Sequence, residues 1–114
     1  MYETIKVYGS FKDMFDKIEG DCFILANNIN FLLRYLTNNF DIDCDYSSKT
    51  FGRIYYNGLS IIILNRKSSR NRVCGIQVKH VIVDCEEGHQ PELVDWLLSR
   101  VRGERTWDLM IINY

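Results

Sequence analysis

The chain has 114 residues, a length typical of one domain with a single hydrophobic core. Hydrophobic residues make up 46% and charged residues 25%, with one proline and seven glycines, which excludes the collagen-like, low-complexity and disordered classes. Fourteen Lys and Arg against fifteen Asp and Glu leave a net charge of −1. The chain is therefore no general polyanion-coating protein, and any nucleic-acid contact must depend on a local basic patch.

The first residues of the chain lack the apolar segment and the small-residue cleavage site of a secretory signal. The longest apolar runs, Ile61–Leu64 and Leu109–Ile112, are far shorter than the ~20 residues that span a bilayer. We therefore expect a cytoplasmic protein without membrane contact. In that setting we expect reduced thiols rather than two disulfides. The cysteines are Cys22, Cys44, Cys74 and Cys85.

The first part of the chain alternates strand and helix patterns. Thr4–Tyr8 alternates in polarity and ends at Gly9, which predicts a strand. Ser10 and Asp13 match the two positions of a capping box at the start of a helix. Cys22–Ala26 is a continuous apolar run, typical of a strand that is covered on both faces. The apolar stripe of the predicted helix consists of Phe11, Met14, Phe15 and Ile18.

A second helix and a β-hairpin follow. Asn27 and Asn28 are favourable caps for the helix, and the acidic stretch from Asp41 to Ser48 predicts a short strand or an extended loop. Residues 51–64 predict a β-hairpin, because Asn57-Gly58 supplies the two positive-φ residues of a type I′ turn. The stripe of the second helix consists of Ile29, Leu32, Leu33, Leu36 and Phe40.

The last part of the chain contains two more strands and a helix. Val78–Val83 predicts a strand that ends at Asp84, and Gln90–Val101 predicts a helix with Pro91 in its first turn. We expect Trp96 and Leu97 to be buried in that helix, together with Leu93 and Val101. The final strand is Asp108–Ile112.

This order predicts one α/β domain over residues 1–114. It has a largely parallel sheet with helices on both faces, and the antiparallel hairpin of residues 51–64 is an edge insertion or a local extension of that sheet. We expect Cys22–Ala26, Val78–Val83 and Leu109–Ile112 to be adjacent, parallel, buried strands, because each is a nearly continuous apolar run.

Ligands of α/β sheets collect at the carboxyl ends of the strands, where Asp84 follows the aliphatic run Val81–Val83. That is the Walker B pattern, which presents a hard carboxylate oxygen to Mg²⁺. The stretch from Phe51 to Glu87 resembles a segment of the phage terminase and helicase-like P-loop ATPases: a hairpin around Asn57-Gly58, a basic loop ending in Gly75, and this strand. The resemblance extends in order over most of the chain. It implies a motor-type core that binds Mg²⁺ and ATP.

Two departures separate the chain from that family. The phosphate-binding signature Gly-x-x-x-x-Gly-Lys-Ser/Thr is absent, and Tyr8–Asp13 stands in its place with an acid that repels a triphosphate. Cys85 replaces the acid expected after Asp84, and Glu86 comes one residue late. We therefore expect a noncatalytic P-loop-like interaction module without a cofactor, with a composition compatible with a viral or phage genome.

Other functions stay open. Asp84 and Glu86 are the candidate catalytic residues of a Mg²⁺-dependent nucleotide hydrolase or nuclease. Cys74, His80, Cys85 and His89 lie close in sequence but lack the tight cysteine pair of a zinc site, so we expect no metal. We expect a protein or nucleic-acid partner to bind at a basic patch, and the competing interpretation is that this patch is a solvated loop. Tyrosines 46, 55 and 56 either supply stacking surfaces for that partner or pack within the sheet. The patch consists of Arg66, Lys67, Arg70, Arg72 and Lys79.

Overall fold

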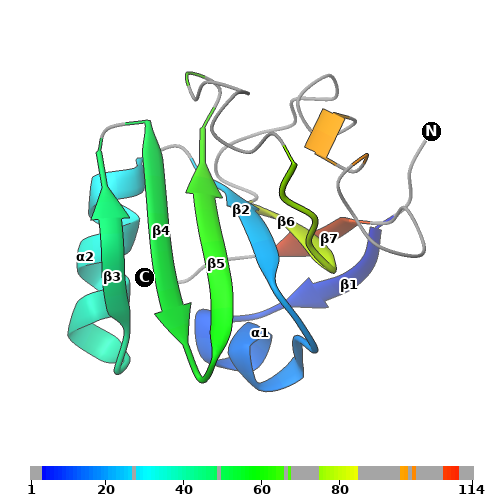
Figure 1. The fold of residues 1–114 in the computed structure, drawn as a ribbon. Helices are drawn as coiled ribbons and strands as arrows, with labels where there is room; N and C mark the ends of the chain where they lie inside the picture. The colour runs from blue at the N-terminus through cyan, green and yellow to red at the C-terminus, as the bar shows by residue number, and fades with distance from the viewer. Residues whose placement is uncertain are drawn as a thin grey trace.

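The computed structural model describes residues 4–26, 28–48, 50–65, 67, 75–84, 96–97, 99 and 107–110. For residues 4–7, 84 and 107–110 it describes the backbone. These parts of the chain form one mixed sheet with two helices behind it in the view of Figure 1. The elements are β1 (Thr4–Tyr8), α1 (Phe11–Lys17), β2 (Cys22–Leu25), α2 (Ile29–Asn39), β3 (Asp43–Ser47), β4 (Phe51–Tyr56), β5 (Leu59–Leu64), β6 (His80–Asp84) and β7 (Trp107–Met110).

The strand order is β1-β7-β6-β2-β5-β4-β3. The pairs from β1 to β5 are parallel, while β5-β4 and β4-β3 are antiparallel. The α/β class is confirmed. A largely parallel sheet is not an adequate description, because the antiparallel strands form one whole end of a mixed sheet.

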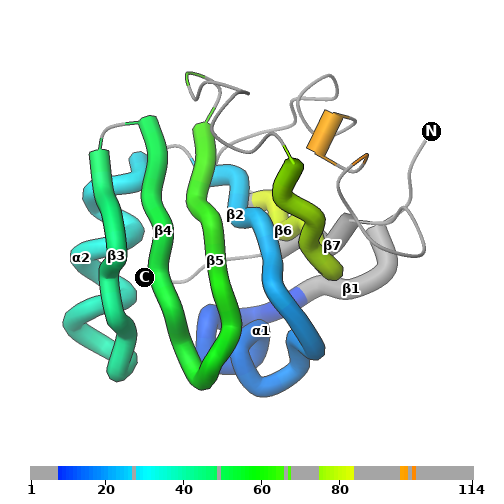
Figure 2. The backbone as a smooth tube through the Cα atoms, in the orientation of Figure 1, coloured from blue at the N-terminus to red at the C-terminus, as the bar shows by residue number. Residues whose placement is uncertain are grey.

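The predicted parallel neighbours are observed, since β6 lies between β2 and β7 and pairs in parallel with both. The hairpin is a local extension of the sheet and not an edge insertion. Its second strand, β5, lies between β2 and β4 (Figure 2), so β5 is an interior strand. Asn57 and Gly58 have φ values of 50° and 78°, as a type I′ turn requires.

Both helices pack on the same face of the sheet, with the predicted apolar stripes buried except for Phe40, which is partly buried. Phe15 of α1 contacts Phe40 and Tyr56, with ring centroids 5.0 and 4.6 Å away. Gly52 of β4 lets α2 approach closely, because a Cβ at this position would lie 3.2 Å from Leu33 Cδ1. The contacts of this face therefore fix both helices against the sheet.

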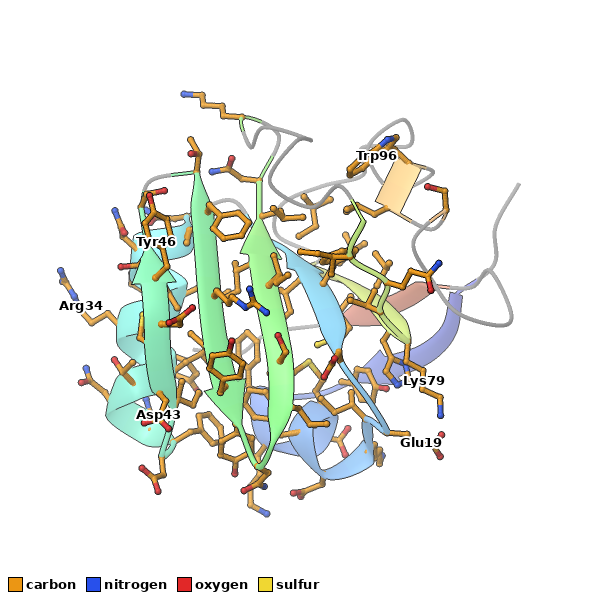
Figure 3. The ribbon with its side chains drawn as sticks, viewed as in Figure 1. Glu19, Arg34, Asp43, Tyr46, Lys79 and Trp96 are labelled. Atoms are coloured by element: carbon orange, nitrogen blue, oxygen red, sulfur yellow. The ribbon has the colours of Figure 1, made fainter. Side chains whose placement is uncertain are left out.

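The opposite face carries a second buried cluster, to which Leu97 contributes. Trp96 and Leu97 have helical backbone, and the rest of the predicted helix Gln90–Val101 lies outside the described residues, apart from Ser99. The expectation that both residues are buried is only half right: Leu97 is fully buried, whereas Trp96 packs at the margin of the cluster and stays partly exposed (Figure 3). The other members are Phe23, Leu25, Phe51, Ile62, Leu64, Val78, Val81 and Val83.

Two of the four cysteines, Cys22 and Cys44, are described. Cys22 is buried in β2, where it behaves as a small apolar side chain. Cys44 is exposed, because all five residues of the edge strand β3 are exposed. In the described part of the chain, neither helix has the length and apolar character needed to cross a membrane.

Candidate functional site at the carboxyl ends of the strands

The carboxyl ends of the parallel strands meet at one edge of the sheet, and Asp84 lies there as predicted. Tyr8 at the end of β1 and Asp84 at the end of β6 both pair with Met110 of β7. Two strand spacings separate the backbones of Tyr8 and Asp84, a distance of about 10 Å. The edge therefore brings Asp84 near the β1–α1 connection, where the phosphate loop of a P-loop protein is expected.

That connection consists of Gly9 and Ser10 alone, because β1 ends at Tyr8 and α1 begins at Phe11. One half of the predicted capping box is observed: Ser10 Oγ accepts a hydrogen bond from the Asp13 amide at 3.2 Å. The Gly9 amide in turn donates to Asp13 Oδ2 at 3.4 Å. The chain's own carboxylate thus faces the backbone N–H groups at this turn.

Asp13 is held in the ionised form at this position. The hydrogen bond and ion pair with Lys17, at 2.9 Å, lower the pKa of the Asp13 carboxyl, and the Gly9 amide acts in the same direction. Lys12, the nearest match to a phosphate-loop lysine, pairs with Asp16 at 3.5 Å. Both lysines of α1 therefore face carboxylates of α1 itself.

The other described polar side chains of this edge serve local turns. Asn28 caps α2, since its Oδ1 accepts from the Phe31 amide at 3.0 Å. Asn65, which follows β5 and is 7% exposed, accepts from the Lys67 amide at 2.9 Å. These bonds shape the edge and leave Lys67 exposed just beyond the end of β5.

The predicted basic patch is not one cluster. Lys67 follows the carboxyl end of β5, whereas Lys79 precedes the amino end of β6. Because β5, β2 and β6 run in parallel and in register, Lys67 and Lys79 lie at opposite edges of the sheet. Lys79 Nζ pairs with Glu19 Oε2 at 3.4 Å (Figure 3). Arg66, Arg70 and Arg72 lie outside the described residues.

The amino-end edge contains polar contacts that sequence reasoning missed. The Asp21 carbonyl accepts from the amides of Lys79 and His80, at 2.8 and 3.3 Å, and its carboxylate accepts from the Ser60 amide at 2.9 Å. His80 Nε2 accepts from the Glu19 amide at 3.3 Å. Asp21 thus fixes the starts of β5 and β6 against β2, and no local pattern marks it for that role.

A shallow hollow of about 390 Å³ lies at the same edge. Its polar lining includes the Lys79–Glu19 pair, and Asp21 is bonded to Ser60 as described above. The three charged side chains of the lining, Glu19, Asp21 and Lys79, therefore each have a polar partner among the described residues. The lining residues are Glu19, Gly20, Asp21, Gln77, Val78 and Lys79.

The structure describes some, but not all, of the residues weighed for a zinc site and for a Mg²⁺ site. Within the described residues, no group of three or more His, Cys, Asp and Glu side chains has the arrangement to hold a metal ion. Of the four residues weighed for zinc, His80 is the described one, and it is 8% exposed at the start of β6. Glu86, the second carboxylate of the hydrolase or nuclease hypothesis, lies outside the described residues.

The three tyrosines weighed for stacking have different surroundings. Tyr56 packs on the helix face against Phe15. Tyr46 and Tyr55 are 42% and 37% exposed. Tyr46 pairs with Arg53 across β3 and β4, and the Arg53 guanidinium lies 5.6 Å from the centroid of the Tyr55 ring. The exposed surface of these tyrosines is therefore on β3 and β4, away from the carboxyl ends of β1 and β6.

Comparison with solved structures finds a similar fold in part of the large terminase of a thermophilic bacteriophage. One crystal form superposes with a TM-score of 0.53 and 15% sequence identity over 98% of this chain. The ADP complex in another crystal form gives 0.51 and 16% identity over 96%. The chain spans about a third of the terminase, 34% and 33% respectively. The likeness shows a terminase-like fold. No family model matches the chain, and no curated protein matches it.

Proposed function

We propose that this chain is a phage-related, terminase-like α/β domain that does not hydrolyse nucleotides and that binds a protein or nucleic-acid partner through its basic segment, residues 66–72. The terminase-like fold supports the relationship, although the match extends over only a third of the terminase. The absence of hydrolysis and the binding role are inferred from the residues of this chain.

The β1–α1 connection carries the proposal. A phosphate-binding loop of the P-loop type needs about eight residues of signature, so that successive amides surround the phosphates. Here two residues join β1 to α1, and the Gly9 amide already donates to Asp13. An incoming triphosphate would meet a carboxylate of like charge in place of a ring of amides.

The basic segment supports the binding role. Four of its seven residues are Arg or Lys in a chain with a net charge of −1. It follows the carboxyl end of β5, and Lys67, its described member, is exposed. Arginine side chains can contact phosphate or carboxylate groups with two parallel hydrogen bonds, which suits an anionic surface on a partner.

Nucleotide binding is tested with a fluorescent ATP analogue and Mg²⁺. We expect no saturable binding up to about 1 mM nucleotide, which corresponds to less than about 4 kcal/mol of binding free energy. Phosphate release at the rate of a protein-free blank is expected from the same samples. Saturable, Mg²⁺-dependent binding that is lost in Asp84→Asn would overturn the proposal.

Partner binding is tested with fluorescein-labelled single-stranded and double-stranded DNA 20-mers and with a polyglutamate peptide. Arg70→Glu with Arg72→Glu should weaken binding to the anionic probe by at least about tenfold, because a reversed charge meets like charge. Arg34→Glu with Lys12→Glu reverses the same number of exposed charges on α2 and α1 and serves as the matched control. Equal binding by both double variants would remove the basic segment as the binding surface.

One observation favours a second candidate, a Mg²⁺-dependent nucleotide hydrolase or nuclease that uses Asp84 and Glu86. Asp84 ends β6 at the carboxyl edge of the sheet, where a strand-end carboxylate can bind Mg²⁺. On this alternative, Asp84→Asn abolishes nuclease or phosphatase turnover while the charge reversal at 70 and 72 has little effect on it. Our proposal predicts the reverse pattern: lost partner binding in the charge reversal and no change in Asp84→Asn.

A further inference from the structure

The outer edge of β3 ends the sheet and pairs with no described strand. β3 follows β4 and is the last strand in the order of the described strands. Its five residues are all exposed, and Figure 3 shows it as the outermost strand of the sheet, with Asp43 and Tyr46 toward its two ends. The free edge of such a strand carries backbone groups that can pair with an added strand.

This edge is acidic. Residues 41–48 contain three carboxylates, Asp41, Asp43 and Asp45, and no Lys or Arg. All three are exposed, and none forms an ion pair with another described residue. Arg34 of the neighbouring helix α2 points away from β3 (Figure 3). The strand therefore presents negative charge that the described part of the chain does not neutralise.

Exposed aromatic rings adjoin the carboxylates. Asp43 pairs with Tyr55 across the β3–β4 ladder, so both side chains lie on the face opposite the helices. Tyr46 lies on that face as well, with its ring centroid 5.9 Å from that of Phe51. The Arg53 guanidinium already lies 5.6 Å from the centroid of the Tyr55 ring. The carboxylates and the Tyr46 ring are therefore the groups that favour cationic side chains of a partner.

We propose that the β3 edge binds a basic, extended segment of another protein, which adds to the sheet as a strand next to β3. The negative charge of β3 favours a basic segment over a second copy of this chain or a nucleic acid. Pairing of two β3 edges from two copies would bring four carboxylates of β3 together, and a nucleic acid would bring phosphates against them. This inference is independent of the function proposed for residues 66–72.

The backbone geometry identifies a position where the added strand bonds. The Ser48 amide donates inward, to the Phe51 carbonyl, at 2.8 Å. Because successive amides of a strand point to opposite sides, the Ser47 amide points to the free edge. Ser47→Pro removes this outward donor and leaves the Ser48 bond in place, so it tests the edge without breaking the β3–β4 ladder.

The test uses a fluorescein-labelled octapeptide of alternating lysine and threonine and measures fluorescence anisotropy. We expect saturable binding that Asp43→Asn with Asp45→Asn weakens by about tenfold and that Ser47→Pro weakens by about fivefold. Asp16→Asn, which removes an exposed carboxylate on α1, should change the dissociation constant by less than about twofold. A peptide of alternating glutamate and threonine should not bind.

A second probe separates strand addition from plain charge attraction and does not depend on the folding of a variant. The same lysine–threonine peptide with alternate backbone amides methylated keeps its charge but loses its ladder donors, and it should bind at least about fivefold more weakly. Equal binding of the methylated peptide would overturn strand addition. Concentration-dependent dimerisation of the chain that Ser47→Pro abolishes would overturn the choice of occupant in favour of a second copy.

Discussion

The backbone amide of Gly9 donates to the carboxylate of Asp13 across 3.4 Å, so the first turn of α1 is closed by an acid of the helix itself. The same carboxylate pairs with Lys17, one turn further along α1. A single side chain thereby joins the end of β1 to α1 at the position where P-loop proteins hold phosphate. The ionisation of the Asp13 carboxyl therefore affects the stability of the fold.

Asp13 should make the stability of the fold depend on pH. Its pKa is lowered in the folded chain below the ordinary value of 3.8, chiefly by the bond to Lys17, so it stabilises the fold above its unfolded-state pKa. That contribution is lost as the pH falls through the unfolded-state value toward the lower folded-state pKa. Urea unfolding followed by circular dichroism at several pH values from about 7 to about 3 should show a smaller loss of stability in Asp13→Asn than in the unsubstituted chain.

A control is available on the same helix. Asp16→Asn removes the carboxylate paired with Lys12 but leaves the contacts of Asp13 with Gly9 and Lys17 intact. The Asp16→Asn variant should therefore still lose most of the stability that the unsubstituted chain loses as the pH falls. If Asp16→Asn flattens the pH profile as much as Asp13→Asn does, the bonds of Asp13 are not its source.

Gly52→Ala should destabilise the chain by about 1–3 kcal/mol, because the new methyl group would be forced against α2. The added Cβ would lie 3.2 Å from Leu33 Cδ1 and 3.3 Å from Ile29 Cγ2, and both side chains are buried. Gly9→Ala is the matched control: a Cβ there meets nothing within 4 Å, and the expected change is within about 0.5 kcal/mol. Denaturant midpoints of the two variants measure the difference.

Leu97→Ala should cost about 2–5 kcal/mol, since Leu97 is fully buried in the cluster opposite the helices. Trp96→Ala should cost less, about 1–2 kcal/mol, because part of the indole surface already contacts water. Thermal or urea unfolding of both variants shows which substitution lowers the stability more. A larger loss in Trp96→Ala would show that the margin of the cluster stabilises the fold more than its centre.

Local features of the fold were predictable because local chemistry controls them. Ser10 caps α1 by accepting from the Asp13 amide three residues on, and Asn57-Gly58 turns the hairpin through its own φ preferences. The apolar stripes of α1 and α2 follow from helical periodicity and are buried, apart from the partly buried Phe40. The position of Asp84 at the end of a strand likewise follows from one apolar run and its last residue.

The candidate site was less predictable, because its geometry depends on which strands are neighbours. Lys67 and Lys79 are close in sequence, and composition alone assigned both to one basic patch. They lie at opposite edges because β5 and β6 run in parallel on either side of β2. Asp21 was missed for a related reason, since its bond to Ser60 joins residues far apart in the chain.

The sequence alone determined the α/β class, the caps, the hairpin turn and the helix faces, because side-chain periodicity and backbone preferences operate over a few residues. Tertiary structure alone decided the strand order, which places β5 inside the sheet and leaves β3 at its edge. Apolar strands such as β2, β5 and β6 are equally compatible with several neighbours when read one at a time. Packing of the whole chain selects among them, and with that choice it sets which charges meet and which strand edge stays free.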